Sequence, residues 1–132
     1  MTIIWDDAKY GTGVPQIDAQ HKEWLRQVNL FDAAVMNGRE RENIYSTLAY
    51  LVEYTIQHFA LEESIMAKYH CPALKENIAA HAAFSIRLNE ILRQIELTGP
   101  SAFNAIAIKA ELEQWLINHI CTVDTRLRDY VD

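Results

Sequence analysis

The most constraining feature of this sequence is a repeated spacing of apolar residues, in alternating steps of four and three, in four separate segments. Such a spacing is typical of the inward face of a helical bundle. It predicts helices over residues 18–37, 41–69, 72–97 and 101–119. The residues expected to face the axis are Ile17, His21, Trp24, Val28, Phe31 and Val35; Ile44, Leu48, Leu51, Thr55, His58, Glu62, Ile65 and Tyr69; Leu74, Asn77, His81, Phe84, Leu88, Ile91 and Ile95; and Ile108, Leu112, Trp115 and His119.

Turn-forming residues separate the four helices. Asp18 is a suitable N-cap, Asn37-Gly38 form a C-terminal stop, and Pro72 interrupts the helical pattern. The fourth helix is expected to begin near Ser101. Long helices with short connections predict an all-α, up-down-up-down four-helix bundle, with the whole chain as one domain.

Both ends of the chain lie outside this pattern. Residues 1–17 lack helical periodicity and contain Gly11, Gly13 and Pro15, which predicts an extended arm with Trp5 as its packing anchor. After the fourth helix, a short helix to Tyr130 is expected.

Composition excludes several classes of function. The 12 basic residues are scattered among 18 acidic ones and the net charge is −6, which argues against nucleic-acid binding. Glycine-rich phosphate loops and apolar runs long enough to span a bilayer are both absent from the sequence. Two cysteines and an acidic start predict free thiols and a cytoplasmic protein without a signal peptide.

Polar residues interrupt the apolar stripe of every helix. A buried, ionised Glu62 without a partner would cost several kcal/mol. A bound metal removes this difficulty, and imidazole with carboxylate suits iron, zinc or manganese. The six histidine, glutamate and asparagine members of the stripes are His21, His58, Glu62, Asn77, His81 and His119.

Asp124 is a further candidate ligand. It lies five residues after His119, which breaks the spacing and predicts a helix break between Ile120 and Val123 that turns Asp124 back toward the metal. Four histidines and two carboxylates exceed the needs of one tetrahedral zinc. Two metals bridged by Glu62 and Asp124 fit the count better.

The remaining chemistry-bearing residues are interpreted as structural. His70 lies off the stripe and is expected to be exposed, Cys71 and Cys121 are expected to be structural thiols, and Glu63, like Glu90 and Glu111, is assigned to a solvated face. Trp24, Phe31, Phe84 and Trp115 are expected in the core, some of them walling the metal pocket. Neither the Glu-x-x-His pairs of ferritin-like bundles nor a His-Glu-x-x-His zinc motif occurs.

The sequence resembles the hemerythrins, specifically the prokaryotic type, over essentially its whole length. The resemblance is carried by Trp5, the stretch from Val14 to Lys22, the stretch from His58 to Met66, Pro72, His81-Ala-Ala-Phe84, and the stretch from Trp115 to Asp124. It implies two non-haem irons, joined by two carboxylates and an oxygen atom, and reversible O2 binding at one of them. Carried over by position, His21 and His58 would hold the oxygen-binding iron. Glu62 and Asp124 would bridge, and His81 and His119 would hold the other iron.

Asn77 departs from the pattern implied by this resemblance, because the family has a third histidine for the second iron at this position. Either the weaker amide oxygen coordinates or water takes the position. His70 lies seven residues before Asn77, about 10 Å along a helix, and cannot easily substitute. The resemblance therefore implies reduced occupancy on this side of the centre.

Three functions remain open at this stage. The first is a non-enzymatic O2 binder for storage, transport or sensing, with O2 or small anions as its ligands. The second is a redox enzyme in which peroxide or nitric oxide reacts at an open position on the second iron. The third is a bundle with a degenerate site that acts as a signalling module.

Overall fold

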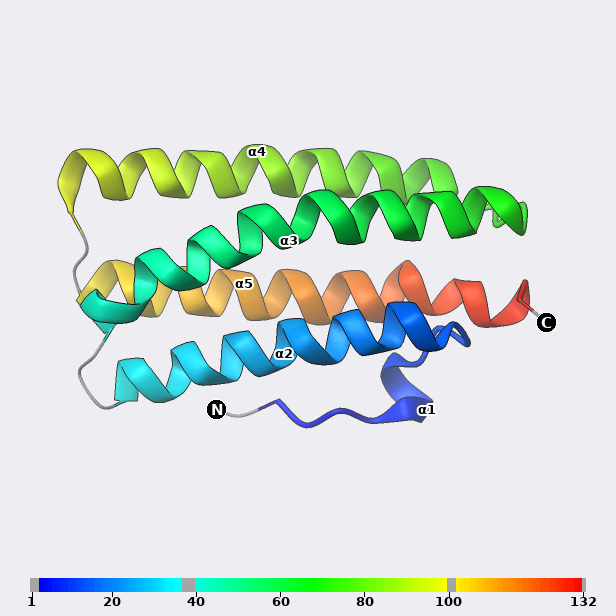
Figure 1. Ribbon diagram of the computed structural model, residues 1–132, viewed down its shortest axis with the longest axis horizontal. Coiled ribbons are helices and arrows are strands. Elements are labelled where there is room, and N and C mark those ends of the chain that lie inside the picture. Colours follow the sequence, from blue (N-terminus) through cyan, green and yellow to red (C-terminus); the bar gives the residue numbers. More distant parts are fainter. Residues whose placement is uncertain (1–2, 37–39, 100–101, 132) are drawn as a thin grey trace.

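The computed structural model describes residues 3–36, 40–99 and 102–131. Its long helices lie side by side and alternate in direction along the chain (Figure 1). α2 packs against α3 and α5, and α3 also packs against α4. The expected all-α four-helix bundle is therefore confirmed. Its helices are α2 (Pro15–Met36), α3 (Glu40–Lys68), α4 (Leu74–Thr98) and α5 (Ala102–Thr122).

The sequence predicted an extended N-terminal arm, but the arm is not extended throughout. It contains a single helical turn, α1 (Asp7–Tyr10), because the Asp6 carboxylate caps that turn by accepting a hydrogen bond from the Ala8 N–H at 3.0 Å. Trp5 packs against the main core with its ring 5.5 Å from the ring of Tyr10, which confirms its anchoring role. Figure 1 shows the arm running alongside α2.

α2 begins at Pro15, three residues before the expected N-cap. Proline suits the first position of a helix, where its missing N–H has no helical partner. Asp18 instead lies within the first turn, and its Oδ1 accepts hydrogen bonds from the Thr12 N–H at 2.9 Å and the Thr12 hydroxyl at 2.8 Å. The acidic side chain thus ties the arm to the helix start rather than capping it.

α5 ends at Thr122, and a 3-10 helix, η1 (Asp124–Asp129), follows directly. The predicted break between Ile120 and Val123 is confirmed, although the final helix is of the tighter 3-10 type and α5 extends three residues beyond His119. η1 is fixed to the arm by Arg128, whose guanidinium donates to the Gly11 carbonyl at 2.6 and 3.0 Å.

Most residues of the predicted stripes are buried, and together they form the bundle core. Four members are only partly buried, because a straight helix drifts relative to a seven-residue repeat: Ile65, Tyr69, Leu74 and Trp115. The drift buries neighbouring side chains, such as Met66 and Leu116, in their place. The stop at Asn37-Gly38, the start at Ser101 and the side chain of Val35 lie outside the described residues. Within the described part of the chain, the helices are too short or too polar for membrane spanning.

Candidate metal centre

Seven polar side chains meet at one end of the bundle, where α2 and α4 begin and α3 and α5 end. The four long helices and η1 all contribute: His21 from α2, His58 and Glu62 from α3, Asn77 and His81 from α4, His119 from α5, and Asp124 from the first position of η1. All seven are at most 6% exposed. The expected convergence of these side chains is confirmed, but the spacing predicts it near the middle of the bundle and it lies toward one end. The middle of the bundle is filled by apolar side chains instead.

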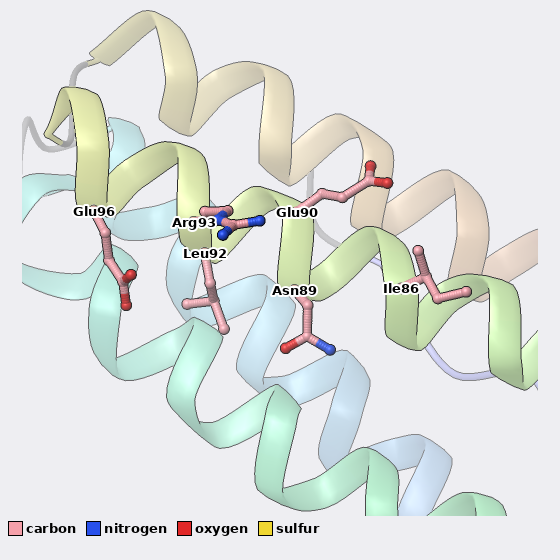
Figure 2. Close-up of a pocket in the computed structure, with 6 residues that line it drawn as sticks. All are labelled: Ile86, Asn89, Glu90, Leu92, Arg93 and Glu96. Atoms are coloured by element: carbon pink, nitrogen blue, oxygen red, sulfur yellow. The ribbon is translucent and has the colours of Figure 1, made fainter.

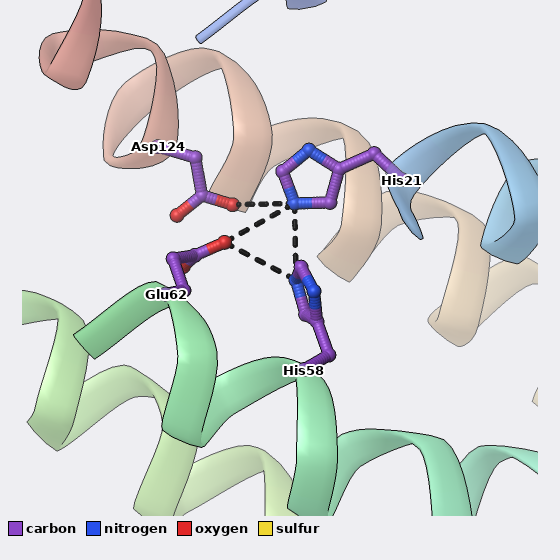
Figure 3. Close-up of side chains that lie close together, drawn as sticks. All are labelled: His21, His58, Glu62 and Asp124. Atoms are coloured by element: carbon purple, nitrogen blue, oxygen red, sulfur yellow. Dashed lines mark hydrogen bonds and ion pairs between the residues drawn. The ribbon is translucent and has the colours of Figure 1, made fainter. Parts of the chain in front are cut away.

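One group of donors comprises His21, His58, Glu62 and Asp124 (Figure 3). The Nε2 atoms of His21 and His58 are 3.1 Å apart. Glu62 Oε2 lies 3.2 Å from His21 Nε2 and 3.1 Å from His58 Nε2. Asp124 Oδ2 lies 3.1 Å from His21 Nε2. All four side chains point at the same small volume.

A second group comprises His81, His119, Glu62 and Asp124. The Nε2 atoms of the two histidines are 3.2 Å apart. Glu62 Oε1 lies 3.1 Å from His81 Nε2, and Asp124 Oδ1 lies 3.1 Å from His119 Nε2. Each carboxylate therefore directs one oxygen at each pair of histidines.

The break after α5 explains how Asp124 reaches this position. Val123 leaves the α-helix, and the 3-10 helix that follows turns the first carboxylate inward, where it is 1% exposed. A continued α-helix would have placed residue 124 off the stripe, since His119 and residue 124 are five positions apart.

Asn77 is fully buried beside the second group. Its Nδ2 donates a hydrogen bond to Glu62 Oε1 at 2.7 Å and lies 3.2 Å from the sulfur of Met66. Its Oδ1 makes no hydrogen bond within the described part of the chain. Both neighbours of Nδ2 are acceptors, so the amide orientation follows from chemistry, because a flipped amide would set two oxygens against each other.

The arrangement fits a pair of cations. Glu62 Oε2 and both oxygens of Asp124 are buried and face histidine Nε2 atoms at 3.1–3.2 Å, which can donate to them only when those nitrogens carry a proton. Nitrogen faces nitrogen across each histidine pair, which is unfavourable when both carry lone pairs. Two cations would satisfy these atoms together. Imidazole and carboxylate donors suit iron.

Two further side chains orient the histidines from outside. Gln20 Oε1 lies 2.6 Å from His58 Nδ1, and Glu63 Oε2 lies 2.9 Å from His81 Nδ1. Both oxygens are acceptors, so each Nδ1 carries the proton and each Nε2 presents its lone pair inward, as in typical metal sites. The assignment of Glu63 to a solvated face was therefore incomplete, since the side chain is 31% exposed but binds His81.

Aromatic rings enclose the centre. Phe59 stacks on His81 with the ring centroids 3.7 Å apart, and Trp115 stacks on His119 at 4.5 Å. Trp24 and Phe84 also border this region, so the expectation that some core aromatics wall the pocket is confirmed. Phe59 was missed because it lies off the predicted stripe, and a single aromatic residue at such a position carries no signal.

The ionisation of the centre in the metal-free protein follows from its burial and its charges. Burial alone would raise the pKa of Glu62, but the surrounding histidines, His119 and His21 foremost, lower it well below the usual range. Burial alone would lower the pKa of His21, but Asp124 and Glu62 raise it to about 9, and the pKa of His119 rises to about 9 in the same way. Burial lowers the pKa of His58. Protons thus partly take the place of cations.

Two surface hollows differ in their relation to the centre. A hollow of about 520 Å³ lies along the outer face of α4 between Ile86 and Glu96, and its lining side chains all come from that helix (Figure 2). None of the seven converging residues lines it. A hollow of about 360 Å³ between α3 and α4 is lined by His81 together with Phe59 and Glu63, and it approaches the second group of donors.

His70 and the two cysteines take no part in the centre. His70 is exposed at the end of α3, where its φ of 54° terminates the helix. Cys71 is buried in a small apolar cluster, and both Cys71 and Cys121 are free thiols. These three interpretations are confirmed.

The fold and the centre together define a helical bundle that holds a pair of metal ions between its helices. Comparison with known proteins identifies the family: residues 12–130 match the description "Hemerythrin HHE cation binding domain". The chain belongs to the hemerythrin family and is a non-haem di-iron, oxygen-binding protein.

Relatives of known sequence include bacteriohemerythrins and a myohemerythrin. The chain is 32% identical over 130 residues to a bacteriohemerythrin of Pseudomonas paraeruginosa, covering 98% of this chain and 80% of that protein. It is 30% identical to a bacteriohemerythrin of Methylococcus capsulatus, with 92% and 91% covered, and 27% identical to a myohemerythrin of Riftia pachyptila, with 95% and 90% covered. A solved wild-type hemerythrin shares the fold with a TM-score of 0.81, at 24% identity and 98% coverage of both chains.

Proposed function

We propose that the di-iron centre serves the storage, transport or sensing of O2, and that each of its ligands has a distinct role. His21 and His58 hold the iron that binds O2. His81 and His119 hold the second iron, and Glu62 and Asp124 bridge the two. When bound, two ferrous ions would supply the electrons for reversible O2 binding.

The observation that carries this assignment is the sharing of both carboxylates. Glu62 contacts His21 and His58 through Oε2 and His81 through Oε1. Asp124 contacts His21 through Oδ2 and His119 through Oδ1. Two single-metal sites would not need the same two carboxylates, whereas a coupled pair does. The aromatic rings around the histidines exclude water and keep the centre in an apolar surrounding.

Anaerobic loading with ferrous iron, followed by exposure to O2, tests the proposal. We expect two irons per chain and a visible absorption band that appears with O2 and disappears when O2 is removed. His21→Ala should abolish the band, and His70→Ala, which changes an exposed histidine outside the centre, should leave it unchanged. A band that survives in His21→Ala would contradict the assignment.

A second candidate function is reaction with peroxide or nitric oxide at the second iron. It is favoured by Asn77, which replaces an imidazole by an amide whose nitrogen faces Glu62. Turnover assays with peroxide and an electron donor distinguish the two functions, since an O2 carrier should show no sustained turnover. For either function we propose a cytoplasmic setting, in which Cys71 and Cys121 stay reduced.

A further inference from the structure

Asn77 contacts the bridging carboxylate through the wrong atom to be a metal ligand. An amide nitrogen carries no available lone pair, and Nδ2 is directed at Glu62 Oε1 and the Met66 sulfur. The amide oxygen, which could coordinate or accept a hydrogen bond, has no hydrogen-bond partner in the described part of the chain, although the residue is fully buried. A buried acceptor of this kind ordinarily has a partner, so a water molecule is expected beside it.

The two halves of the centre consequently offer equal sets of protein donors. The first half has two imidazoles, from His21 and His58, and the second half has two, from His81 and His119. Each half also receives one oxygen atom from Glu62 and one from Asp124. With four protein donors and one oxygen atom shared between the two ions, each ion of octahedral preference would keep one position for a small ligand.

We propose that Asn77 is a positioning residue that leaves an exchangeable coordination position on the second metal, where a small anion binds. This inference rests on the proposed ligand assignment. Nδ2 steadies Glu62, and Oδ1 accepts a hydrogen bond from the water molecule that fills the position until an anion displaces it. Complete burial around Asn77 limits the ligand to a few atoms, such as azide or hydroxide. The positive charge of the metal attracts the anion, since the neighbouring Glu62 and Met66 side chains carry no positive charge.

The test uses the full chain loaded with Co²⁺, whose visible absorption reports ligand changes without any reaction with O2. Metal analysis comes first, and two cobalt ions per chain support the ligand assignment independently of Asn77. Titration with sodium azide then counts the exchangeable positions. We expect two azide ions per chain in the unaltered protein, one in Asn77→His, and two in Asn77→Ala. Asn89→His, on the exposed face of the same helix, is the matched control and should bind two.

The variants separate this inference from direct coordination by Asn77. If the amide oxygen were a ligand, the unaltered protein would bind one azide and Asn77→Ala would bind two, which would overturn the proposal. Equal azide counts in the unaltered protein and Asn77→His would also overturn it. Should Asn77→His fail to fold, the counts for the unaltered protein and Asn77→Ala still decide. Fewer than two cobalt ions in the unaltered protein would instead contradict the proposed function.

Discussion

The two halves of the metal centre have matching inner donors but different outer support. In the half built by His21 and His58, the outer partner of His58 is the neutral amide of Gln20. In the half built by His81 and His119, the outer partner of His81 is the carboxylate of Glu63. An imidazole whose N–H donates to a carboxylate binds a metal ion more strongly than one whose N–H donates to an amide. The half that contains Asn77 is thus the half with the anionic support.

The outer partners distinguish the two halves of the centre, which have only four imidazoles between them. The inner donors alone would make the halves equivalent, so any difference in their metal affinity has to come from the groups behind the histidines and from Asn77. Changes to Gln20 and to Glu63, which lie behind different histidines, should therefore each act on one half.

The largest effect is expected for Glu62→Ala, which removes a donor from both halves. Metal affinity should fall by more than about 100-fold, beyond the range found for outer partners of metal ligands. Helix content should persist, because apolar packing supplies most of the stability. Iron analysis and circular dichroism measure the two effects. Glu53→Ala, an exposed change on α3, is the control, and an unchanged iron content in Glu62→Ala would refute the bridging role.

The metal-free protein should lose stability as the pH rises. His21 and His119, one in each half, have their pKa raised to about 9 by Asp124 and Glu62, against the opposing effect of burial. The stability from this charge pairing is complete below about pH 6.5 and is lost as the pH rises through 9, on the order of a few kcal/mol. Urea unfolding at pH 6.5 and pH 9 measures the loss. Iron-loaded protein should show far less of it, and an equal loss with iron bound would mean that the metals do not occupy these positions.

Changes to the outer partners should act on one half each. Glu63→Gln should weaken the second metal about 10- to 100-fold, whereas Gln20→Ala should weaken the first metal by about 10-fold, because a neutral partner is lost. Stepwise Co²⁺ titrations of both variants resolve the two affinities. If both variants weakened the same metal, the division into halves would be wrong.

The smallest effect is expected outside the centre. Arg87 on α4 pairs with Glu111 on α5 through two contacts, of 2.6 and 2.8 Å, with both side chains more than 40% exposed. Arg87→Ala should lower the free energy of unfolding by about 0.2–1 kcal/mol. Metal affinity should stay unchanged in both halves. A measurable change in Co²⁺ affinity would show that the α4–α5 contact transmits strain to His81 or His119.

The donors that the spacing placed on the bundle axis could be recognised from the sequence, since each histidine on a stripe faces the same interior. Gln20, Glu63 and Phe59 could not, because they flank the stripes and act through contacts between helices. Glu63 in particular has the spacing of a solvated residue, and only the neighbouring α4 brings His81 within hydrogen-bonding distance of it.

The sequence by itself determined the four helices, the apolar stripes and the set of converging histidines, because helix period and side-chain polarity are local properties. It also determined that the fourth helix breaks before Asp124. Only the tertiary structure decided that each carboxylate is shared between two histidine pairs and which end of the bundle holds them. It also decided that Asn77 turns its nitrogen toward Glu62, because that orientation depends on an acceptor fifteen residues away on another helix.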